Sequence, residues 1–447
     1  MNFRIYTFFL LLLQVTSSYA NPFDIYGVSG YSRGRNDAGG VSSRNGESLY
    51  LNPGSLALGK GTVFEAGTVF QYSFLNTPYG DQSIRDPFYV NFSLAFNMPF
   101  RGFLKDRIRV GITGMTPINE IAWVRTRLPR EIFYPYYENR TQRLIIVPGV
   151  SFLIFDTKSL GKLGIGFGIN YFSGLEGAII GYEGATRSVE ARVFEELEGS
   201  YAVTAGISWE REKLRLGFTY RQAFGVDFHN VSFNHVAGTD INIDLTAQAL
   251  YSPHTVVWSA GWFERTWNLE LNIIEQLWSY YKTPFVSMRS QLPLVGSLTG
   301  ELPESEFNNT LGVKIGGSYN YGNLTFSGGV GFEQSFITQQ TGVTNIMDGH
   351  KYSLSMGLSW EFTKGMKVHA HLRYQGLISE THTKKIVTTD GSCGEIPVGD
   401  SNVLIDEIPC VVDDPSTYGF QTSNGGYPSV TSGGGIISGG LSLEVTK

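Results

Sequence analysis

The sequence has little of what marks several common classes of protein. It contains only two cysteines among 447 residues, which argues against a disulfide-rich scaffold and against a metal site built on cysteine. Charged residues make up 17% of the chain, a low share for a soluble protein. The formal net charge of −6 argues against nucleic acid as a partner. After residue 20 no apolar run reaches about 18 residues, so the sequence predicts no membrane-spanning helix.

The first twenty residues contain the one long apolar run of the chain. Arg4 precedes the run from Ile5 to Val15, and Ser18-Tyr19-Ala20 follows, with small residues at the two positions that a signal peptidase reads. At about 11 residues the run is too short for a membrane anchor, which is the alternative interpretation. We therefore predict a signal peptide over residues 1–20 and a mature chain that begins at Asn21.

Secretion bears on the two cysteines, Cys393 and Cys410, which lie in one polar stretch. Outside the cytosol two thiols this close in the sequence are expected to pair. The bond would close a loop of about 18 residues and would stabilise the fold by about 3 kcal/mol in the chain-entropy estimate. We predict a disulfide that fixes this loop.

Glycine and aromatic residues are abundant, with Gly 54, Tyr 24 and Phe 30. Between Lys351 and Leu377 every second residue is apolar, and a short break at Thr363–Gly365 divides the stretch into two runs. Alternation with a period of two indicates β-strands, and two such runs joined by a short turn with glycine indicate a hairpin. One face of this hairpin is apolar and the other is polar. Such a hairpin fits either a soluble β-sandwich or a membrane β-barrel whose polar face lines a water-filled lumen.

The connections between such runs favour the barrel. Fourteen alternating runs can be counted, and the connections after even-numbered runs are brief whereas those after odd-numbered runs are long. This asymmetry is typical of outer-membrane barrels, whose short turns face the periplasm. We predict an all-β fold: a fourteen-stranded antiparallel transmembrane β-barrel over residues 62–447, with long extracellular loops near 175–197, 225–251, 282–308 and 379–433. The runs cover residues 62–76, 87–98, 107–126, 140–156, 161–174, 198–211, 213–224, 252–265, 266–281, 309–321, 323–336, 350–362, 366–378 and 434–446.

The segment before the barrel, residues 21–61, shows no sustained period and is rich in glycine and serine. A disordered tail is one interpretation. The segment nevertheless carries apolar residues such as Ile25, Val28, Leu49 and Leu56. We therefore predict an N-terminal hatch, a small plug that docks inside the lumen.

Four stretches resemble one known family. Asn52-Pro53-Gly54 closes a leader with Gly34-Arg35-Asn36-Asp37-Ala38-Gly39, and it resembles the Asn-Pro-Ala hatch motif of the FadL/TodX (OmpP1-type) outer-membrane transporters of long-chain fatty acids and hydrophobic compounds. Residues 253–280 are similar to that family's strand pair ending in Trp-Ser, residues 348–375 to its late hairpin, and residues 111–119 to its interrupted third strand. Gly54 stands where the family usually has alanine, and Lys447 ends the chain where such strands commonly close on an aromatic residue.

The resemblance implies a barrel closed by a hatch. The family captures apolar molecules outside the cell, passes them into the lumen and releases them sideways at a kinked strand. In this sequence the third run contains Gly111, Gly114 and Pro117. Since proline lacks a ladder donor and glycine weakens a strand, we predict a kink or lateral opening there, with a harmless bulge as the alternative. The hatch motif is then expected to lie against that kink.

Candidate contacts for an apolar ligand come from the fourth run and from two loops. The fourth run is apolar on both faces, so its inward set contacts either the plug or a ligand. In the loop 175–197 the spacing of Val189, Val193 and Leu197 indicates a helical turn. Apolar side chains of the loops either pack on one another or form the first landing site that the resemblance implies. The candidates are Ile145, Val147, Leu153, Phe155, Ile179, Ile180, Val193, Phe228 and Phe233.

Candidate contacts for a carboxylate head group are Arg221, Lys367 and Arg373, which the alternation directs into the lumen. Alternatively these cations only solvate the lumen or pair with Glu270, Glu333 or Glu361. His369 and His371 share the lumenal face, but no third ligand is evident, so we predict no metal.

Together these features predict a passive transport channel in the bacterial outer membrane for hydrophobic molecules such as long-chain fatty acids or hydrocarbons. No nucleotide-binding or nucleophile motif is visible, so we expect neither an energy-driven pump nor an enzyme, and no cofactor. The expected partners are a hydrophobic ligand, outer-membrane lipid and lipopolysaccharide, and the protein is expected to be a monomer. Two alternatives stay open: a general porin for small solutes, and a secretion-linked or surface protein on the same scaffold.

Overall fold

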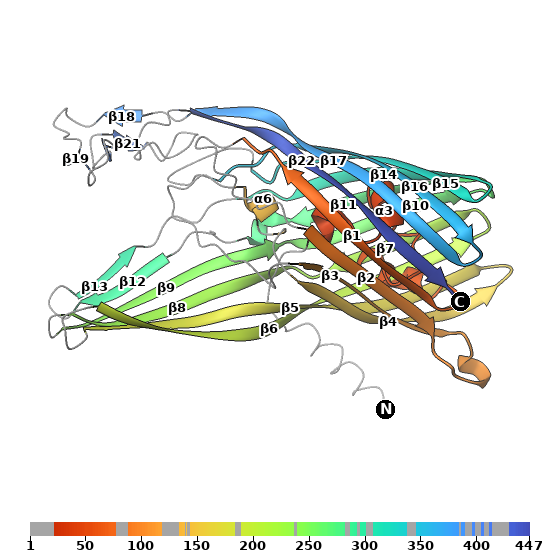
Figure 1. Ribbon diagram of the computed structural model, residues 1–447, viewed down its shortest axis with the longest axis horizontal. Coiled ribbons are helices and arrows are strands. Elements are labelled where there is room, and N and C mark those ends of the chain that lie inside the picture. The colour runs from red at the N-terminus through yellow and green to blue at the C-terminus, as the bar shows by residue number, and fades with distance from the viewer. Residues whose placement is uncertain are drawn as a thin grey trace.

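The wall of the molecule is a single ring of β-strands (Figure 1). The structure is a computed structural model, and it describes residues 22–76, 88–118, 134–138, 140, 144–183, 189–236, 239–281, 287–292, 296–300, 307–337, 346–383, 386–388, 396–397, 404–405, 411–413 and 429–447. The ring consists of β1 (Val63–Ser73), β2 (Phe88–Asn97), β3 (Ile108–Pro117), β4 (Ile145–Thr157), β5 (Gly161–Glu183), β6 (Val189–Arg211), β7 (Leu214–Arg221), β10 (His254–Phe263), β11 (Trp267–Leu277), β14 (Thr310–Tyr321), β15 (Leu324–Glu333), β16 (Lys351–Thr363), β17 (Met366–Thr383) and β22 (Ser429–Thr446).

Each of these fourteen strands pairs antiparallel with its neighbours, and the last pairs with the first. The closing ladder runs from Val63 opposite Thr446 to Ser73 opposite Ile436. A closed ring leaves no unpaired strand edge, which is the condition for a sheet that crosses lipid. The predicted fourteen-stranded antiparallel barrel is confirmed.

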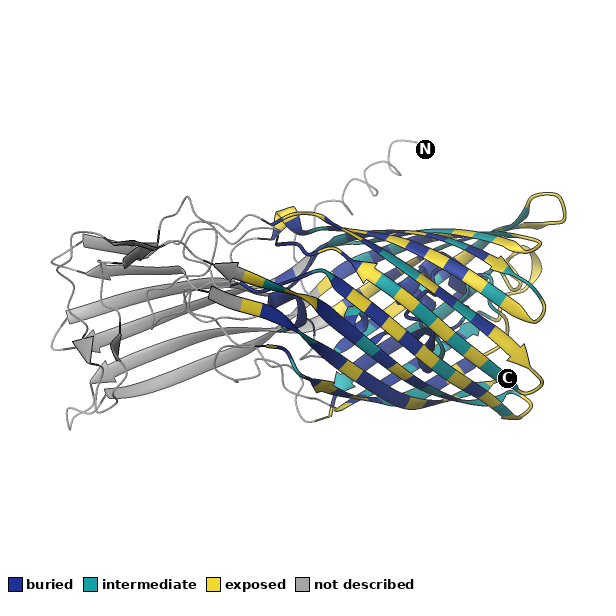
Figure 2. Cartoon of the chain, turned by 90° about the horizontal axis from the view of Figure 1, so that it is seen from above, coloured by how far each residue is buried: buried dark blue, intermediate teal, exposed yellow. Residues whose placement is uncertain are grey.

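The alternation along each strand is reproduced in the burial of its side chains (Figure 2). On β16, Ser353 and Ser355 face the lumen and are at most 8% exposed, whereas Leu354 and Met356 point outward and are 51% and 56% exposed. The outer face therefore presents a continuous apolar surface, which would be unfavourable in water and is favourable in hydrocarbon. Among the described residues, no helix has the length and apolar character needed to span a bilayer.

The two ends of the barrel differ. At one end β14–β15 and β16–β17 are joined by turns at Gly322 and Gly365, whose positive φ values of 59° and 81° suit glycine. At the other end β5 and β6 extend beyond the ring (Figure 1). Further strands lie at that end: β8 (Phe224–Val236), β9 (Thr239–Ser252), β12 (Ser287–Leu292), β13 (Gly296–Gly300), β18 (Ile386–Thr388), β19 (Ile396–Pro397), β20 (Leu404–Ile405) and β21 (Val411–Asp413).

One sequence prediction at this end is wrong. Residues 189–197 do not form a helical turn, because they belong to β6 and pair with β5 without interruption, from Glu183 opposite Val189 inward. Spacings of four and eight residues are also multiples of two, so the same three apolar residues can share one face of a strand. The predicted loop 225–251 is likewise a hairpin, β8–β9, and β8 runs parallel to β5.

The chain before β1 lies inside the ring. We call residues 22–60 the N-terminal segment. Almost all of its side chains are buried, and its polar groups bond to the walls around it. The N-terminal segment contains four short helices, α2 to α5. One more helix, α6, and two 3-10 turns, η1 and η2, lie later in the chain. These elements are α2 (Phe23–Tyr26), α3 (Gly30–Gly34), α4 (Ser48–Leu51), α5 (Pro53–Leu56), α6 (Pro135–Glu138), η1 (Gly102–Leu104) and η2 (Trp278–Tyr280).

Candidate functional site

Asn52, Pro53 and Gly54 form the start of α5. The Asn52 backbone is extended, its Oδ1 accepts a hydrogen bond of 3.0 Å from the Gly54 N–H, and Pro53 occupies the first helical position. These are the residue types that favour a helix start at those positions. The Asn52 side chain also donates from Nδ2 to the carbonyl oxygen of Ile207 on β6, at 3.0 Å. The motif thus ties a helix start to the barrel wall.

The contact between this motif and the wall is backbone against backbone. A Cβ on Gly54 would lie 2.7 Å from the Ser208 nitrogen, and one on Gly206 would lie 2.2 Å from Asn52 Oδ1. Ser151 on β4 donates to the Pro53 carbonyl oxygen. The motif therefore lies on the β4–β7 wall. The glycines of β5 and β6 provide the flat surface that the motif needs, while Leu49, just before the motif, lies against Gly111 of the third strand.

The third strand is continuous where it is described. β3 pairs with β2 from Tyr89 opposite Pro117 onward and with β4 up to Met115 opposite Ile145, without a register shift at Gly111 or Gly114. Gly111 and Gly114 thus keep their cross-strand partners, while the ladder with β4 is described only up to Met115, so the predicted kink or lateral opening near Pro117 stays a prediction. Residues 119–133, the rest of the predicted run, lie outside the described residues.

A gap in strand pairing lies one strand further on. Between β4 and β5 the ladder passes from Ile146 opposite Tyr171 to Gly149 opposite Gly168, and the two residues between them on β4, Val147 and Pro148, have no partner on β5. Proline has no N–H to donate to a ladder, which explains the break. Sequence reasoning missed this site, although a proline in the middle of an alternating run was a visible signal.

The predicted apolar contacts fall into three groups. Ile145 and Val147 are fully buried, face inward and belong to the main apolar cluster, whereas Leu153 and Phe155 are half-buried nearer the short turns. For the residues on the extended strands only the backbone is described: Ile179 lies opposite Val193, Ile180 lies beside Phe233, and Phe228 lies opposite Ala247. Cys393 and Cys410 lie outside the described residues, so their pairing stays a prediction.

The predicted head-group cations contact carboxylates. Arg373 bonds to Asp37 of the N-terminal segment, and Arg221 lies 3.8 Å from Asp24 of the same segment. Lys367 pairs with Glu444 across β17–β22, at 3.6 Å. Two of the three cations thus hold the N-terminal segment to the wall.

The glutamates expected as their partners have other contacts. Glu270 pairs with Arg35 of the N-terminal segment at 3.5 Å, both side chains being fully buried. It also accepts a hydrogen bond from the Val41 N–H, at 2.9 Å. Glu333 accepts a hydrogen bond of 3.0 Å from the Tyr136 hydroxyl. Burial alone would raise the pKa of Asp24, but Arg140 and Arg221 hold that pKa below its usual value.

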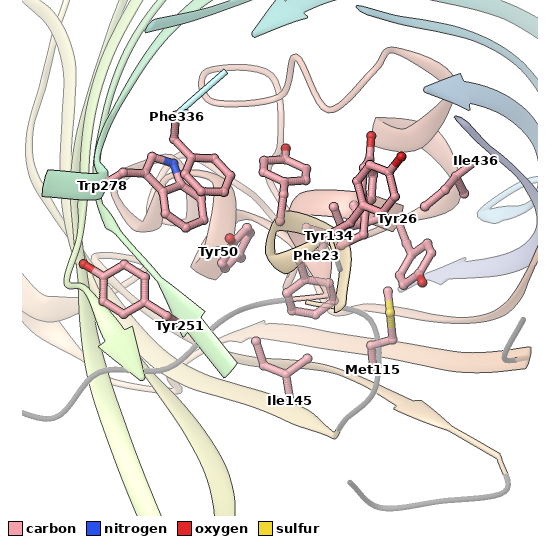
Figure 3. Close-up of a cluster of buried hydrophobic side chains, with 14 of the residues drawn as sticks. Phe23, Tyr26, Tyr50, Met115, Tyr134, Ile145, Tyr251, Trp278, Phe336 and Ile436 are labelled. Atoms are coloured by element: carbon pink, nitrogen blue, oxygen red, sulfur yellow. The ribbon is translucent and has the colours of Figure 1, made fainter. Parts of the chain in front are cut away.

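An aromatic cluster fills the lumen on the side of the N-terminal segment away from the short turns (Figure 3). Trp278 stacks on Phe336 with ring centroids 4.2 Å apart, and Tyr251 stacks on Tyr281 at 4.5 Å. We call the following residues the aromatic cluster: Phe23, Tyr50, Tyr136, Tyr251, Trp278, Tyr281, Phe307 and Phe336.

Two cations lie over one ring of this cluster. Arg140 lies 4.3 Å and Lys351 lies 4.1 Å from the Tyr136 ring centroid. Arg140 also lies 3.7 Å from Asp24, and its Nη1 has no hydrogen-bond partner although the side chain is fully buried. Sequence reasoning missed Tyr136 and Arg140, because nothing local shows that the connection between β3 and β4 folds back into the lumen as α6.

A polar cavity of about 300 Å³ lies on the opposite side of the N-terminal segment, towards the short turns. It is lined by charged and polar groups that include Arg44, Glu47, Lys60, Lys367 and Glu444. Burial and the neighbouring Glu65 carboxylate raise the pKa of Glu47 to about 7.

One of the two lumenal histidines lies at this polar cavity. His369 lines the polar cavity, and its Nδ1 lies 2.6 Å from the Ser359 hydroxyl. In the part of the chain that the structure describes, no group of three or more histidine, cysteine or acidic residues is arranged to hold a metal.

The fold and this interior define a class: closed antiparallel β-barrels of fourteen strands with an apolar outer face and a chain segment folded inside the lumen. No family model and no curated protein sequence matches the chain. Several solved structures match the chain. A FadL homologue of Pseudomonas aeruginosa superposes with a TM-score of 0.55 at 13% identity, covering 94% of this chain and 98% of that one.

Two toluene transporters give similar results. TodX of P. putida has a TM-score of 0.50 at 13% identity, covering 93% of this chain and 98% of that one. TbuX of Ralstonia pickettii has a TM-score of 0.50 at 12% identity, covering 95% of this chain and 99% of that one. The chain has the fold of the FadL/TodX transporters.

Proposed function

We propose that this protein is a passive outer-membrane channel for hydrophobic molecules of the long-chain fatty acid or hydrocarbon class. The observation that carries the proposal is the aromatic cluster, which buries Trp278 and Phe336 inside a barrel whose other lumenal faces are lined mostly by polar and charged side chains. A channel for polar solutes does not need a buried aromatic cluster in its lumen. The similarity in fold to FadL and TodX supports the same conclusion.

The N-terminal segment acts as the hatch in this proposal. It fills the middle of the lumen between the aromatic cluster and the polar cavity. An ion pair from Arg35 to Glu270 holds it to β11, and one from Asp37 to Arg373 holds it to β17. A hydrophobic molecule is captured at the outer end, binds among the aromatic rings, and passes when the segment rearranges. Transport runs downhill, because binding energy and the concentration gradient are its only driving forces.

Arg140 and Arg221 give the ligand a way to move the hatch. Both guanidinium groups contact Asp24 of α2, and Arg221 also lies 4.5 Å from the Tyr50 ring centroid. A carboxylate head group has the same chemistry as the Asp24 side chain, and an arginine fork binds it well. We propose that such a head group competes with Asp24 for these arginines and so loosens the first turn of the hatch.

The filled lumen opposes the alternative of a general porin. A porin needs a continuous aqueous path, whereas here residues 22–60 and α6 occupy the lumen. The secretion-linked alternative rests on the loop 379–433, most of which lies outside the described residues, and nothing in the described part favours it.

The test is to purify the protein in a detergent that is not a lipid and to identify bound molecules by mass spectrometry. We expect a fatty acid or hydrocarbon to co-purify, and the fluorescent probe 1-N-phenylnaphthylamine to bind and to be displaced by oleate. Purified protein that carries no such molecule, binds neither compound and conducts ions freely in planar bilayers would overturn the proposal in favour of a porin.

A further inference from the structure

We infer that the outer wall of the barrel carries a binding site for one phospholipid, with an acyl chain in a hollow over Ala260 and the phosphate group at Arg211. The hollow has a volume of about 390 Å³ and lies across the outward faces of β6, β7, β10 and β11. It is separate from the aromatic cluster and from the polar cavity, which both lie in the lumen. The inference goes beyond the proposed function, because it does not depend on what the lumen carries.

The hollow exists because one outward position holds a small residue among large ones. Ala260 on β10 lies opposite Leu216 on β7 and Leu271 on β11, and both leucines are outward-facing, at 43% and 37% exposed. On β6 the next residue in this row is Trp209, opposite Leu216. The alanine side chain ends at its Cβ, whereas its neighbours on both sides extend further from the sheet. The row therefore has a depression at Ala260, and all four residues line the hollow.

A second row of large side chains borders the hollow on the side away from the short turns. Trp258, two residues before Ala260 on β10, lies opposite Phe218 on β7 and Ile273 on β11. The rings of Trp258 and Phe218 pack edge to face, with centroids 4.6 Å apart. Edge-to-face packing is a favoured arrangement of two aromatic rings, so it holds both rings in place along this border.

An acyl chain in this hollow gains contacts that it does not find on a flat wall. Lipid tails are as apolar as the side chains of the wall, so the hydrophobic effect does not favour one part of the wall over another. Van der Waals contact does, because a chain in the hollow contacts atoms below it and on both sides. The apolar lining thus selects a chain, but it does not by itself select a head group.

Two tryptophans show where the hollow lies relative to the membrane surface. Trp209 donates from Nε1 to the Leu160 carbonyl oxygen at 2.8 Å, and Trp262 donates from Nε1 to Glu264 Oε1 at 3.1 Å. Tryptophans with an apolar ring and a bonded N–H are typical of the boundary between hydrocarbon and head groups. The hollow therefore lies on the hydrocarbon side of this boundary, within reach of the head-group layer.

The group next to the hollow in that layer is Arg211. It follows Trp209 by two residues on β6, towards the short turn, and its side chain is exposed. Among the residues that the structure describes, none forms an ion pair with Arg211. An arginine fork binds a phosphate group through two parallel hydrogen bonds. A phospholipid whose chain occupies the hollow can thus place its phosphate at a guanidinium group that is free to bind it.

The other charges at this rim also favour a phosphate. Lys213, in the same turn as Arg211, pairs with Glu264 of the neighbouring turn at 2.7 Å. Arg265 is exposed beside Glu264, and Glu212 is the second carboxylate of the two turns. Three cations thus stand against two carboxylates, which leaves the rim positive.

The position of the hollow also selects the kind of lipid. The short turns of an outer-membrane barrel face the periplasm, and the hollow is at that end of the wall. The leaflet on the periplasmic side consists of phospholipid, whereas lipopolysaccharide occupies the opposite leaflet. The occupant is therefore a phospholipid. This step rests on the proposed outer-membrane location.

The experiment uses a phosphatidylglycerol that carries a photoactivatable diazirine in one acyl chain. The full-length protein is reconstituted into vesicles of phosphatidylethanolamine with a small share of this probe and irradiated, and labelled peptides are quantified by mass spectrometry. We expect label on the β6, β7 and β10 peptides of the hollow at least threefold above label on β15 and β16. Equal labelling around the wall would mean an unselective lipid shell and would overturn the site.

A filled hollow tests the acyl-chain part. Ala260→Trp places a large side chain in the depression, and we expect at least threefold less label on the hollow peptides than in the parent. The matched control is Ala370→Trp on β17, an outward alanine between Leu358 and Leu441, which should leave that label unchanged. Unchanged label in Ala260→Trp, or an equal loss in the control, would overturn the chain site.

The phosphate part is tested at an exposed residue, so that folding is not at risk. Arg211→Gln should lower the label on the hollow peptides at least twofold, because the lipid loses its phosphate contact. Arg101→Gln removes another exposed arginine at the same end of the barrel and should have no such effect. Equal losses in both variants would mean general attraction of anionic lipid and would overturn the role of Arg211.

A second copy of this chain is the alternative occupant of the hollow. It would exclude the probe from the hollow peptides, and native mass spectrometry would show a dimer, which would overturn the lipid site. The labelling involves no uptake, so its failure is distinguishable from a failure of the proposed channel.

Discussion

Arg373, in the middle of β17, bonds to Asp37 of the N-terminal segment, although the two residues are 336 positions apart in the sequence. Both side chains are almost fully buried. A buried pair of this kind gives little net stability, but removing one partner leaves an uncompensated charge, which costs about 3–5 kcal/mol. The pair therefore fixes the position of the N-terminal segment relative to β17.

This pair gives a first prediction. Arg373→Met should loosen the N-terminal segment and produce ion-conducting openings in planar bilayers that the parent lacks. Asp37→Asn combined with Arg373→Met should suppress part of the effect, because no unpaired charge remains. The control is Lys213→Met, which breaks an exposed pair with Glu264 and should conduct like the parent. Equal conductance in Arg373→Met and the control would show that the pair does not hold the segment.

The pH dependence of closure follows from Glu47. Its pKa is raised to about 7 when the segment is docked, whereas a released segment has the ordinary value near 4.5. The docked state therefore binds the proton more tightly, and its advantage is complete below about pH 4.5 and is lost as the pH rises through 7. We expect more openings at pH 8 than at pH 5.

Two variants check the assignment to this carboxyl. Glu47→Gln should weaken the pH dependence, since the neutral amide mimics the protonated acid facing Ser29, Ser32 and Ser43. Glu264→Gln, at an exposed turn, should keep the dependence of the parent. A Glu47→Gln channel whose openings still rise between pH 5 and pH 8 as in the parent would refute the prediction.

Binding in the aromatic cluster can be tested with one substitution. Trp278→Ala removes a fully buried ring that stacks on Phe336, and we expect 1-N-phenylnaphthylamine to bind about tenfold more weakly, given about 0.5–1.5 kcal/mol per aromatic pair plus the lost area. Trp258→Ala is the matched control, because Trp258 is 56% exposed on the outer face. If the two substitutions weaken binding equally, the cluster is not the binding site.

The close approach of Asn52 to the wall predicts a steric effect. Gly206→Ala would place a Cβ 2.2 Å from Asn52 Oδ1, so we expect a loss of about 1–3 kcal/mol in unfolding free energy from overpacking. At Gly328, on β15, a Cβ would meet nothing closer than 3.8 Å, and the same substitution should have little effect. Denaturant unfolding in detergent measures both, and similar losses at the two glycines would contradict the contact.

Much of the fold could be predicted because β-strand alternation is a local property. The polar and apolar faces of β16 and β17 follow from a period of two, and the short turns follow from positions such as Thr363–Gly365. The same local signal cannot distinguish a strand from a helix where apolar residues recur at multiples of four, which is why residues 189–197 were predicted wrongly.

The interior was much harder to predict, because it depends on which distant residues meet. The alternation directs Arg373 and Arg221 into the lumen, but nothing local shows that Asp37 and Asp24 contact them. Likewise the inward fold of α6 is set by long-range contacts such as Tyr136 to Glu333. Pro148 is the exception: its effect on the β4–β5 ladder is local and was readable from the sequence.

The hatch role can be tested by removal of the segment. A chain without residues 22–56 keeps all fourteen strands of the ring, so we expect it to insert as a barrel and to conduct ions continuously, while the parent stays closed. Conductance of the shortened chain that is no greater than that of the parent would show that some other part of the chain blocks the lumen.

The central claim, that this barrel carries hydrophobic molecules and not polar ones, is tested most directly by comparing two uptake rates in the same cells. The rates are those of 1-N-phenylnaphthylamine and of a polar chromogenic β-lactam in cells with and without the protein. We predict that the protein raises uptake of the hydrophobic probe severalfold and leaves entry of the β-lactam unchanged. Faster entry of the β-lactam with no change for the hydrophobic probe would contradict the account.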